Sequence, residues 1–126
     1  MTKRFHHLHG KGIQMTTSSR ITILGSGTCV PSLKRNPCSF LMQTGTDNLL
    51  FDCGPGVMRR LLEIGTSIFD ISHLFISHFH PDHCGELASF LFSLKYPSPP
   101  PQQRPLTIIA GMGFRAFFEG LKSVYE

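Results

Sequence analysis

The sequence predicts an α/β domain in which short apolar strands alternate with amphipathic helices. Runs of branched and large apolar residues, such as 21–24 and 73–77, end at glycine or polar residues, as buried strands do. Elsewhere apolar residues recur at helical spacing, as Leu87, Phe90 and Leu94 do. A hydrophobic content of 40% with 16% charged residues is typical of a globular chain, and 126 residues suffice for one domain.

The elements follow one another without an internal repeat. Strands are expected at 21–24, 39–43, 48–52, 73–77 and 106–110, and the second and third of them form a hairpin across 44–47. Helices are expected at 57–64, at about 83–96 and at 114–124. The segment 97–105 holds five prolines and is expected to be an extended loop.

The net charge of +4 is unevenly distributed along the chain. Four of the twelve basic residues lie in the first 20 positions, which contain no acidic residue, so the rest of the chain is neutral. A global field that attracts polyanions is therefore excluded, and contacts to nucleic acid must come from local placement. In the neutral part, the paired cations are Lys34-Arg35 and Arg59-Arg60, for which a solvated surface is the alternative role.

We expect either that the first 19 residues are a disordered tail or that Met15 is the true start, and that the domain occupies 20–126. No apolar run is long enough for a secretory signal or a membrane span. The four cysteines show no paired spacing and are expected to be buried and reduced. These features predict a cytoplasmic protein without a membrane partner.

The stretch ISHFHPDH, residues 76–83, has the highest density of potential metal-binding side chains in the sequence. Three of the seven histidines and one aspartate fall within six positions. Because side chains alternate along a strand, His78 and His80 are expected on the same side, where they can hold one metal ion. Pro81 turns the chain into the next helix, and the helix dipole favours a carboxylate at its start. Asp82 and His83 are therefore expected to face a second ion.

Imidazole and carboxylate ligands suit zinc, and also manganese or iron. Two such ions about 3.5 to 4 Å apart can hold a bridging hydroxide for attack on an ester. The alternative is that these histidines only cap the end of a strand. Their density within one short stretch favours the metal site.

The pattern His78-x-His80-x-Asp82-His83 after an apolar strand resembles the signature of the metallo-β-lactamase superfamily. The segments 24–28, 31–36 and 51–56 are similar to the opening of ribonuclease Z and its relatives, zinc phosphodiesterases that trim the 3′ end of precursor tRNA. This resemblance covers 21–126 continuously. It implies a four-layer αβ/βα sandwich with metals at the sheet edges, of which this chain would be the N-terminal part, and a homodimer.

The resemblance also implies roles for individual residues. His78 and His80 would bind the first of two Zn2+ ions, and Asp82 and His83 the second, with Asp82 as the predicted catalytic residue. Asp52 would orient a ligand histidine, as carboxylates beside metal sites commonly do.

The loop that ends at Asn36 would lie near the substrate, which is tRNA or another phosphodiester. Its predicted substrate-binding residues are Lys34, Arg35 and Asn36.

The set of metal ligands is incomplete in this sequence. After His83 there is no histidine or aspartate, and the acidic residues are Glu86, Glu119 and Glu126. Two protein ligands for each ion are fewer than the three that a catalytic zinc normally has. We therefore expect the N-terminal portion of a longer hydrolase, inactive by itself. Two alternatives are a catalytically inactive or binding-only remnant, and a hydrolase of another ester on the same fold.

Overall fold

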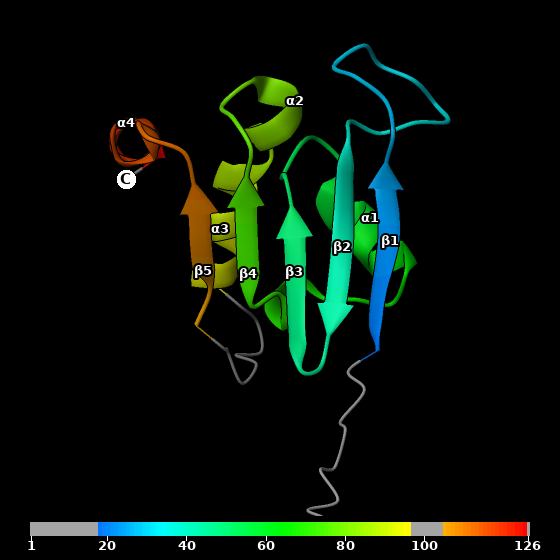
Figure 1. Cartoon of the computed structure of the whole chain (residues 1–126). Coiled ribbons are helices and arrows are strands. Elements are labelled where there is room, and N and C mark those ends of the chain that lie inside the picture. Colours follow the sequence, from blue (N-terminus) through cyan, green and yellow to red (C-terminus); the bar gives the residue numbers. More distant parts are fainter. Residues whose placement is uncertain (1–17, 97–104, 126) are drawn as a thin grey trace, which may run out of the picture.

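A computed structural model of the chain describes residues 18–96 and 105–125 (Figure 1). The described residues form a five-stranded sheet with the strand order β1-β2-β3-β4-β5. Strands β1, β2 and β3 pair antiparallel, whereas β3, β4 and β5 pair parallel. The strands are β1 (Ser19–Gly25), β2 (Ser39–Thr44), β3 (Asp47–Phe51), β4 (His73–Ile76) and β5 (Thr107–Ala110). All five strands and the α/β class predicted from the sequence are confirmed.

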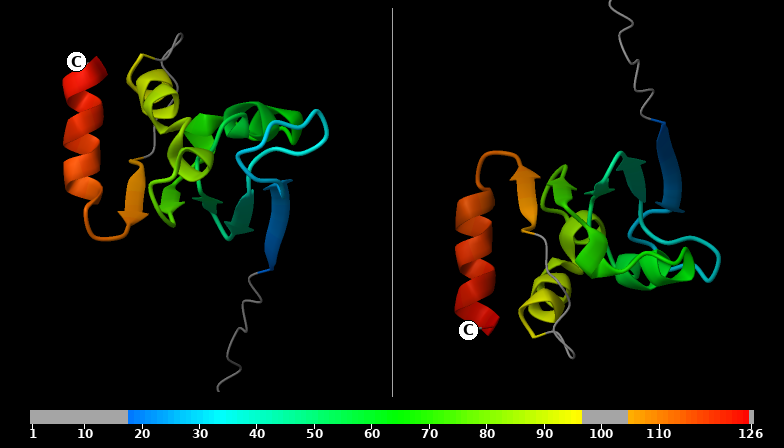
Figure 2. Two further views of the ribbon diagram at one scale, coloured as in Figure 1. Left: turned by 90° about the horizontal axis from the view of Figure 1, so that it is seen from above. Right: turned by 90° about the horizontal axis from the view of Figure 1, so that it is seen from below.

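The helices lie mainly on one face of this sheet (Figure 2). They are α1 (Val57–Glu63), α2 (Pro81–Cys84), α3 (Leu87–Lys95) and α4 (Phe114–Tyr125), with a 3-10 turn η1 (Ile68–Asp70). Helices α1 and α3 cover the sheet, α2 lies above β4, and α4 runs beside β5 at the edge (Figures 1 and 2).

The core lies between the sheet and the covering helices. Leu41, Leu50 and Leu74 contribute from three neighbouring strands, and each is fully buried. Leu61 of α1 and Phe90 of α3 close the core from the other side and are also fully buried. Truncating such a leucine to alanine typically costs about 2 to 5 kcal/mol. This packing fixes the position of the C-terminal end of β4, where the polar motif follows.

The opposite face of the sheet carries a continuous apolar row across all five described strands. The register pairs its members in order, from Ile23 through Phe40, Phe51 and Phe75 to Ile109. The three phenylalanine rings are stacked, with centroids 4.2 and 4.5 Å apart. Ile23 and Ile109 at the two ends are 65% and 43% exposed. No described helix covers this row (Figure 2).

Two expectations about the central motif are wrong in their local detail. Strand β4 ends at Ile76, so His78 and His80 lie on a loop and not on the strand. The reason is that the Ser77 amide donates to the Asp52 side chain instead of a neighbouring strand.

The helix expected at 83–96 is divided into α2 and α3. The Glu86 amide donates to the carbonyl oxygen of Cys53, 2.9 Å away, and therefore leaves the helical hydrogen-bond ladder.

Some side chains are more exposed than their spacing suggested. Leu62 and Ile64, expected on the apolar side of α1, are 67% and 40% exposed. Cys53 and Cys84 are buried as expected, but Cys29 and Cys38 lie at the surface, and all four are free thiols. Spacing alone did not distinguish the two loop cysteines from those beside the core.

Among residues 18–96 and 105–125, no helix is long and apolar enough to cross a membrane. The tail expected at 1–19 lies almost entirely outside the described residues, as does most of the loop expected at 97–105.

Candidate metal centre

Asp52 lies at the centre of a hydrogen-bond network at the upper end of β3. The residue follows the strand directly and has a positive φ of 63°, a conformation that aspartate adopts more readily than most residues. Its amide donates to the Phe75 carbonyl oxygen at 2.7 Å. Its carboxylate accepts from the Ser77 amide at 2.8 Å and from the Ser77 hydroxyl at 2.9 Å. Asp52 thus ties β3 to the chain leaving β4.

The same carboxylate fixes the ring of His83. Oδ2 of Asp52 lies 2.7 Å from Nδ1 of His83, and the two side chains are only 13% and 19% exposed. A proton on Nδ1 satisfies this contact and leaves the lone pair on Nε2, the arrangement typical of a metal-binding histidine. Nε2 lies 3.6 Å from Oδ2 of Asp82. The orienting role predicted for Asp52 therefore has a direct geometric basis.

His78 and His80 extend from the loop between β4 and α2, on either side of a half-buried aromatic residue. Phe79 between them stacks on Phe117 of α4, with ring centroids 5.0 Å apart. The His78 ring lies 4.0 Å from the His83 ring and 4.6 Å from the His80 ring, centroid to centroid. Both loop histidines are exposed. The three histidine rings of the motif therefore lie close together beyond the C-terminal end of β4.

Ser77 is a participant that the sequence did not indicate. Its hydroxyl group, which donates to Asp52, lies 3.0 Å from Nδ1 of His78. Its oxygen can accept a hydrogen bond from Nδ1–H, which leaves Nε2 of His78 available to a ligand. Its position directly before His78 was the available signal.

The donor types of this cluster fit a divalent transition metal, because imidazole nitrogens and a carboxylate are the ligands that zinc prefers. However, the described parts of the chain contain no group of three or more histidine, cysteine, aspartate or glutamate side chains placed to hold one ion. The side chains of the motif approach one another in pairs. In the pair formed by His83 and Asp82, the histidine ring is held in place by Asp52.

Close backbone packing holds α2 against the segment that follows Asp52. The Cys53 amide donates to the His83 carbonyl oxygen at 2.7 Å. A side chain at Gly54 would collide with the carbonyl oxygen of Asp82 and approach Pro37 to 3.1 Å. Burial, followed by the nearby Glu86 charge, raises the pKa of Cys53 well above its ordinary value. Its thiol therefore stays neutral and supports the site by packing.

The predicted substrate loop reaches the same edge of the sheet. Lys34 and Arg35 are exposed, whereas Asn36 is half-buried. The Asn36 side chain packs against Gly56, the residue that precedes α1. Gly56 has a positive φ of 86°, and a side chain at this position would collide with the Asn36 amide. Asn36 is thus placed to hold the loop in position, and its contact with the substrate stays a prediction.

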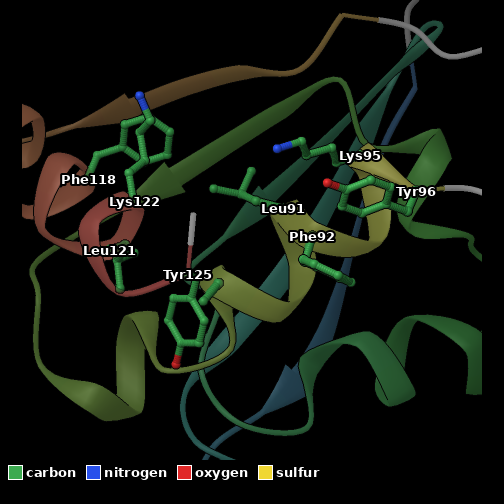
Figure 3. Close-up of a pocket in the computed structure, with 9 residues that line it drawn as sticks. Leu91, Phe92, Lys95, Tyr96, Phe118, Leu121, Lys122 and Tyr125 are labelled. Carbon is green, nitrogen blue, oxygen red and sulfur yellow. The ribbon is translucent and has the colours of Figure 1, made fainter.

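A separate groove of about 220 Å3 lies between α3 and α4 (Figure 3). Leu91, Phe92 and Leu121 line it together with both tyrosines of the chain, Tyr96 and Tyr125. It is lined by no histidine, cysteine or carboxylate, the side chains that usually bind a catalytic metal ion. The polar edge at α2 is therefore the candidate functional site.

Comparison with known proteins agrees with this fold. The chain is 40% identical to ribonuclease Z of Halorubrum lacusprofundi over 91 residues, which cover 72% of this chain and 28% of that protein. The short form of human tRNase Z superposes with a TM-score of 0.69 at 27% identity, over 86% of this chain and 40% of the human one. The metallo-beta-lactamase fold protein YhfI from Bacillus subtilis gives a TM-score of 0.70 at 21% identity, over 82% and 41% of the two chains.

The protein therefore has a metallo-β-lactamase fold of the ribonuclease Z-like type. Residues 19–113 match the family described as Anti-Pycsar protein Apyc1, and the chain belongs to that family. This chain spans between 20% and 33% of the length of the first relatives found, which are therefore considerably longer.

Proposed function

We propose that the protein is a metal-dependent hydrolase that cleaves phosphodiester bonds, and that its substrate is a tRNA precursor. The observation that carries this proposal is the convergence of His78, His80 and His83 beside Asp82, with His83 already oriented by Asp52. The similarity to ribonuclease Z and to tRNase Z supports a nucleic acid as the substrate.

The motif residues would hold the metal as two pairs. His78 and His80 provide one pair, and Asp82 and His83 provide the other. When bound, a divalent ion such as zinc supplies Lewis acidity toward a phosphoryl ester. Asp52 keeps the proton of His83 on Nδ1, so that Nε2 is available without rearrangement.

Metal content and turnover, measured on the complete gene product, test this proposal. We expect bound zinc by elemental analysis and hydrolysis of bis-(nitrophenyl) phosphate. His80→Ala should lower both, because it removes an exposed donor without disturbing the core. His73→Gln is the matched control, since His73 begins β4, away from the motif, and contacts Ser72 at 3.0 Å. Zinc content that is equal in wild type and His80→Ala would contradict the proposal.

A binding-only role is the second candidate. It is favoured by one observation, the lack of any three-ligand group among residues 18–96 and 105–125. In that case the full-length protein should contain little metal and hydrolyse no phosphodiester, while still binding RNA. The homodimer expected from the resemblance stays a prediction, which light scattering of the full-length protein would test.

A further inference from the structure

A second hollow, of about 260 Å3, lies between the end of β1, the loop that follows it, and α1. Its walls combine the backbone of Gly25 and Ser26 with the side chains of Lys34, Arg35 and Arg60. We call this hollow the cationic groove. The mechanism proposed for the histidine cluster does not use Arg60, and the sequence left open whether this residue contacts a polyanion or belongs to a solvated surface.

The groove carries an excess of positive charge. Glu63 is the carboxylate among its lining residues, against three cationic side chains. Arg60 donates to Glu63 at 2.7 Å and is only 34% exposed, so its guanidinium forms part of the wall. Within the described residues, neither Lys34 nor Arg35 takes part in an ion pair. An anion entering the groove therefore meets two uncompensated cations and one arginine that is shared with Glu63.

The loop that presents Lys34 and Arg35 is held in place. The Gly27 amide donates to the Asn36 carbonyl oxygen at 2.8 Å, and Gly27 also pairs with Pro37. The Asn36 side chain packs against Gly56 at the start of α1. Binding a ligand to a pinned loop requires less loss of conformational entropy than ordering a free one.

The groove and the histidine cluster are linked by close packing around the segment that follows Asp52. Gly54 is closely approached both by Pro37, at the end of the pinned loop, and by the backbone of Asp82. The Cys53 amide donates to the His83 carbonyl oxygen. This segment therefore contacts both the loop that carries Lys34 and Arg35 and the helix α2.

We propose that the cationic groove binds phosphates of a nucleic acid strand away from the bond that is cleaved, with Arg60 as a phosphate-binding residue and Glu63 as a group that weakens this binding. The biological role of the ligand rests on the proposed function. A guanidinium suits this task because its planar fork can bind phosphate through two parallel hydrogen bonds. The hydrogen bond from Arg60 lowers the pKa of Glu63, so that its carboxylate is ionised and competes with phosphate for the guanidinium.

The test is the salt dependence of RNA binding by the full-length protein, measured by fluorescence anisotropy with a labelled single-stranded oligouridylate. Each lost phosphate contact should reduce the slope of log affinity against log salt by about 0.7. We expect this reduction, with several-fold weaker binding, for Arg60→Gln. Glu63→Gln should instead strengthen binding several-fold, because Arg60 is released from its partner.

Arg59→Gln is the matched control. Arg59 is the neighbouring residue of α1 and pairs with the same Glu63 at 3.1 Å, but it is 85% exposed and does not line the groove. Its slope should equal that of the wild type. Equal changes in the Arg59 and Arg60 variants, or no change in either, would overturn the proposal. Because the assay is run with a chelator, it does not depend on metal or turnover. Absence of hydrolysis with the expected slopes would therefore reject only the proposed function.

Discussion

The two ends of the histidine motif differ in how the protein holds them. On the α2 side, His83 is mostly buried and bound to Asp52 at 2.7 Å. On the loop side, His78 and His80 are exposed, and their rings make a T-shaped contact with centroids 4.6 Å apart. The neighbouring Phe79 anchors that part of the loop by stacking on α4.

This difference shows which half of the candidate centre is organised by the fold itself. The Asp52 network joins β3, the Ser77 amide and α2, so it contributes to folding whether or not a ligand binds. The loop histidines contribute little to folding and are available to a ligand. A substitution on the α2 side should therefore change stability, whereas one on the loop side should change binding alone.

The largest effect on stability is expected for Asp52→Ala. The substitution removes the acceptor of the Ser77 amide and hydroxyl groups and of His83, and leaves alanine at a positive φ. We expect a loss of about 3 kcal/mol in the free energy of unfolding, since these bonds involve a buried carboxylate. Urea unfolding followed by far-UV circular dichroism measures it.

Asp52→Asn is the control for Asp52→Ala, because it keeps the shape, one carbonyl acceptor and tolerance of the positive φ. It should lose clearly less stability. An Asp52→Ala variant as stable as the wild type would show that the network does not organise the α2 side.

A smaller loss is expected for Ser77→Ala. The amide bond from residue 77 to Asp52 remains, while the hydroxyl contacts to Asp52 and His78 disappear. The expected cost is about 1 kcal/mol, the usual net value of one hydrogen bond. The same urea titration measures it, and nitrogen NMR of the His83 ring should still show the proton on Nδ1. A His83 tautomer that changes with this substitution would mean that Ser77, and not Asp52, orients the ring.

The smallest effect on folding is expected for His80→Ala. Because this side chain is exposed and packs against no core residue, the free energy of unfolding should change by less than about 0.5 kcal/mol. Thermal unfolding without metal measures it. A loss similar to that of Asp52→Ala would remove the distinction between the two sides of the motif.

The sequence predicted the strands and the chemistry of the motif because both depend on local patterns. Alternation and apolar runs located β1 to β5, and the spacing of His78, His80, Asp82 and His83 indicated a shared site. Pairings between distant segments were not predictable in the same way. Asp52 takes the amide of a residue 25 positions away and thereby ends β4 early. The Cys53 carbonyl oxygen similarly takes the Glu86 amide and divides the predicted helix.

The cationic groove could not be predicted from the sequence either, because it also depends on contacts between distant segments. Arg59 and Arg60 are adjacent in the sequence, which assigned both of them the same two alternative roles, polyanion binding or a solvated surface. Their surroundings differ only because the loop containing Lys34 folds back beside Arg60. The position of that loop depends on the contact between Asn36 and Gly56, two residues 20 positions apart, which no periodic pattern encodes.

The groove between α3 and α4 determines which part of this chain its intrinsic fluorescence reports on. The chain has no tryptophan, and its two tyrosines, Tyr96 and Tyr125, both line that groove (Figure 3). Intrinsic emission therefore reports on the packing of α3 against α4 and is insensitive to events at the histidine cluster. A tryptophan introduced in place of Phe79, beside His78 and His80, would give the other end of the sheet an optical signal of its own.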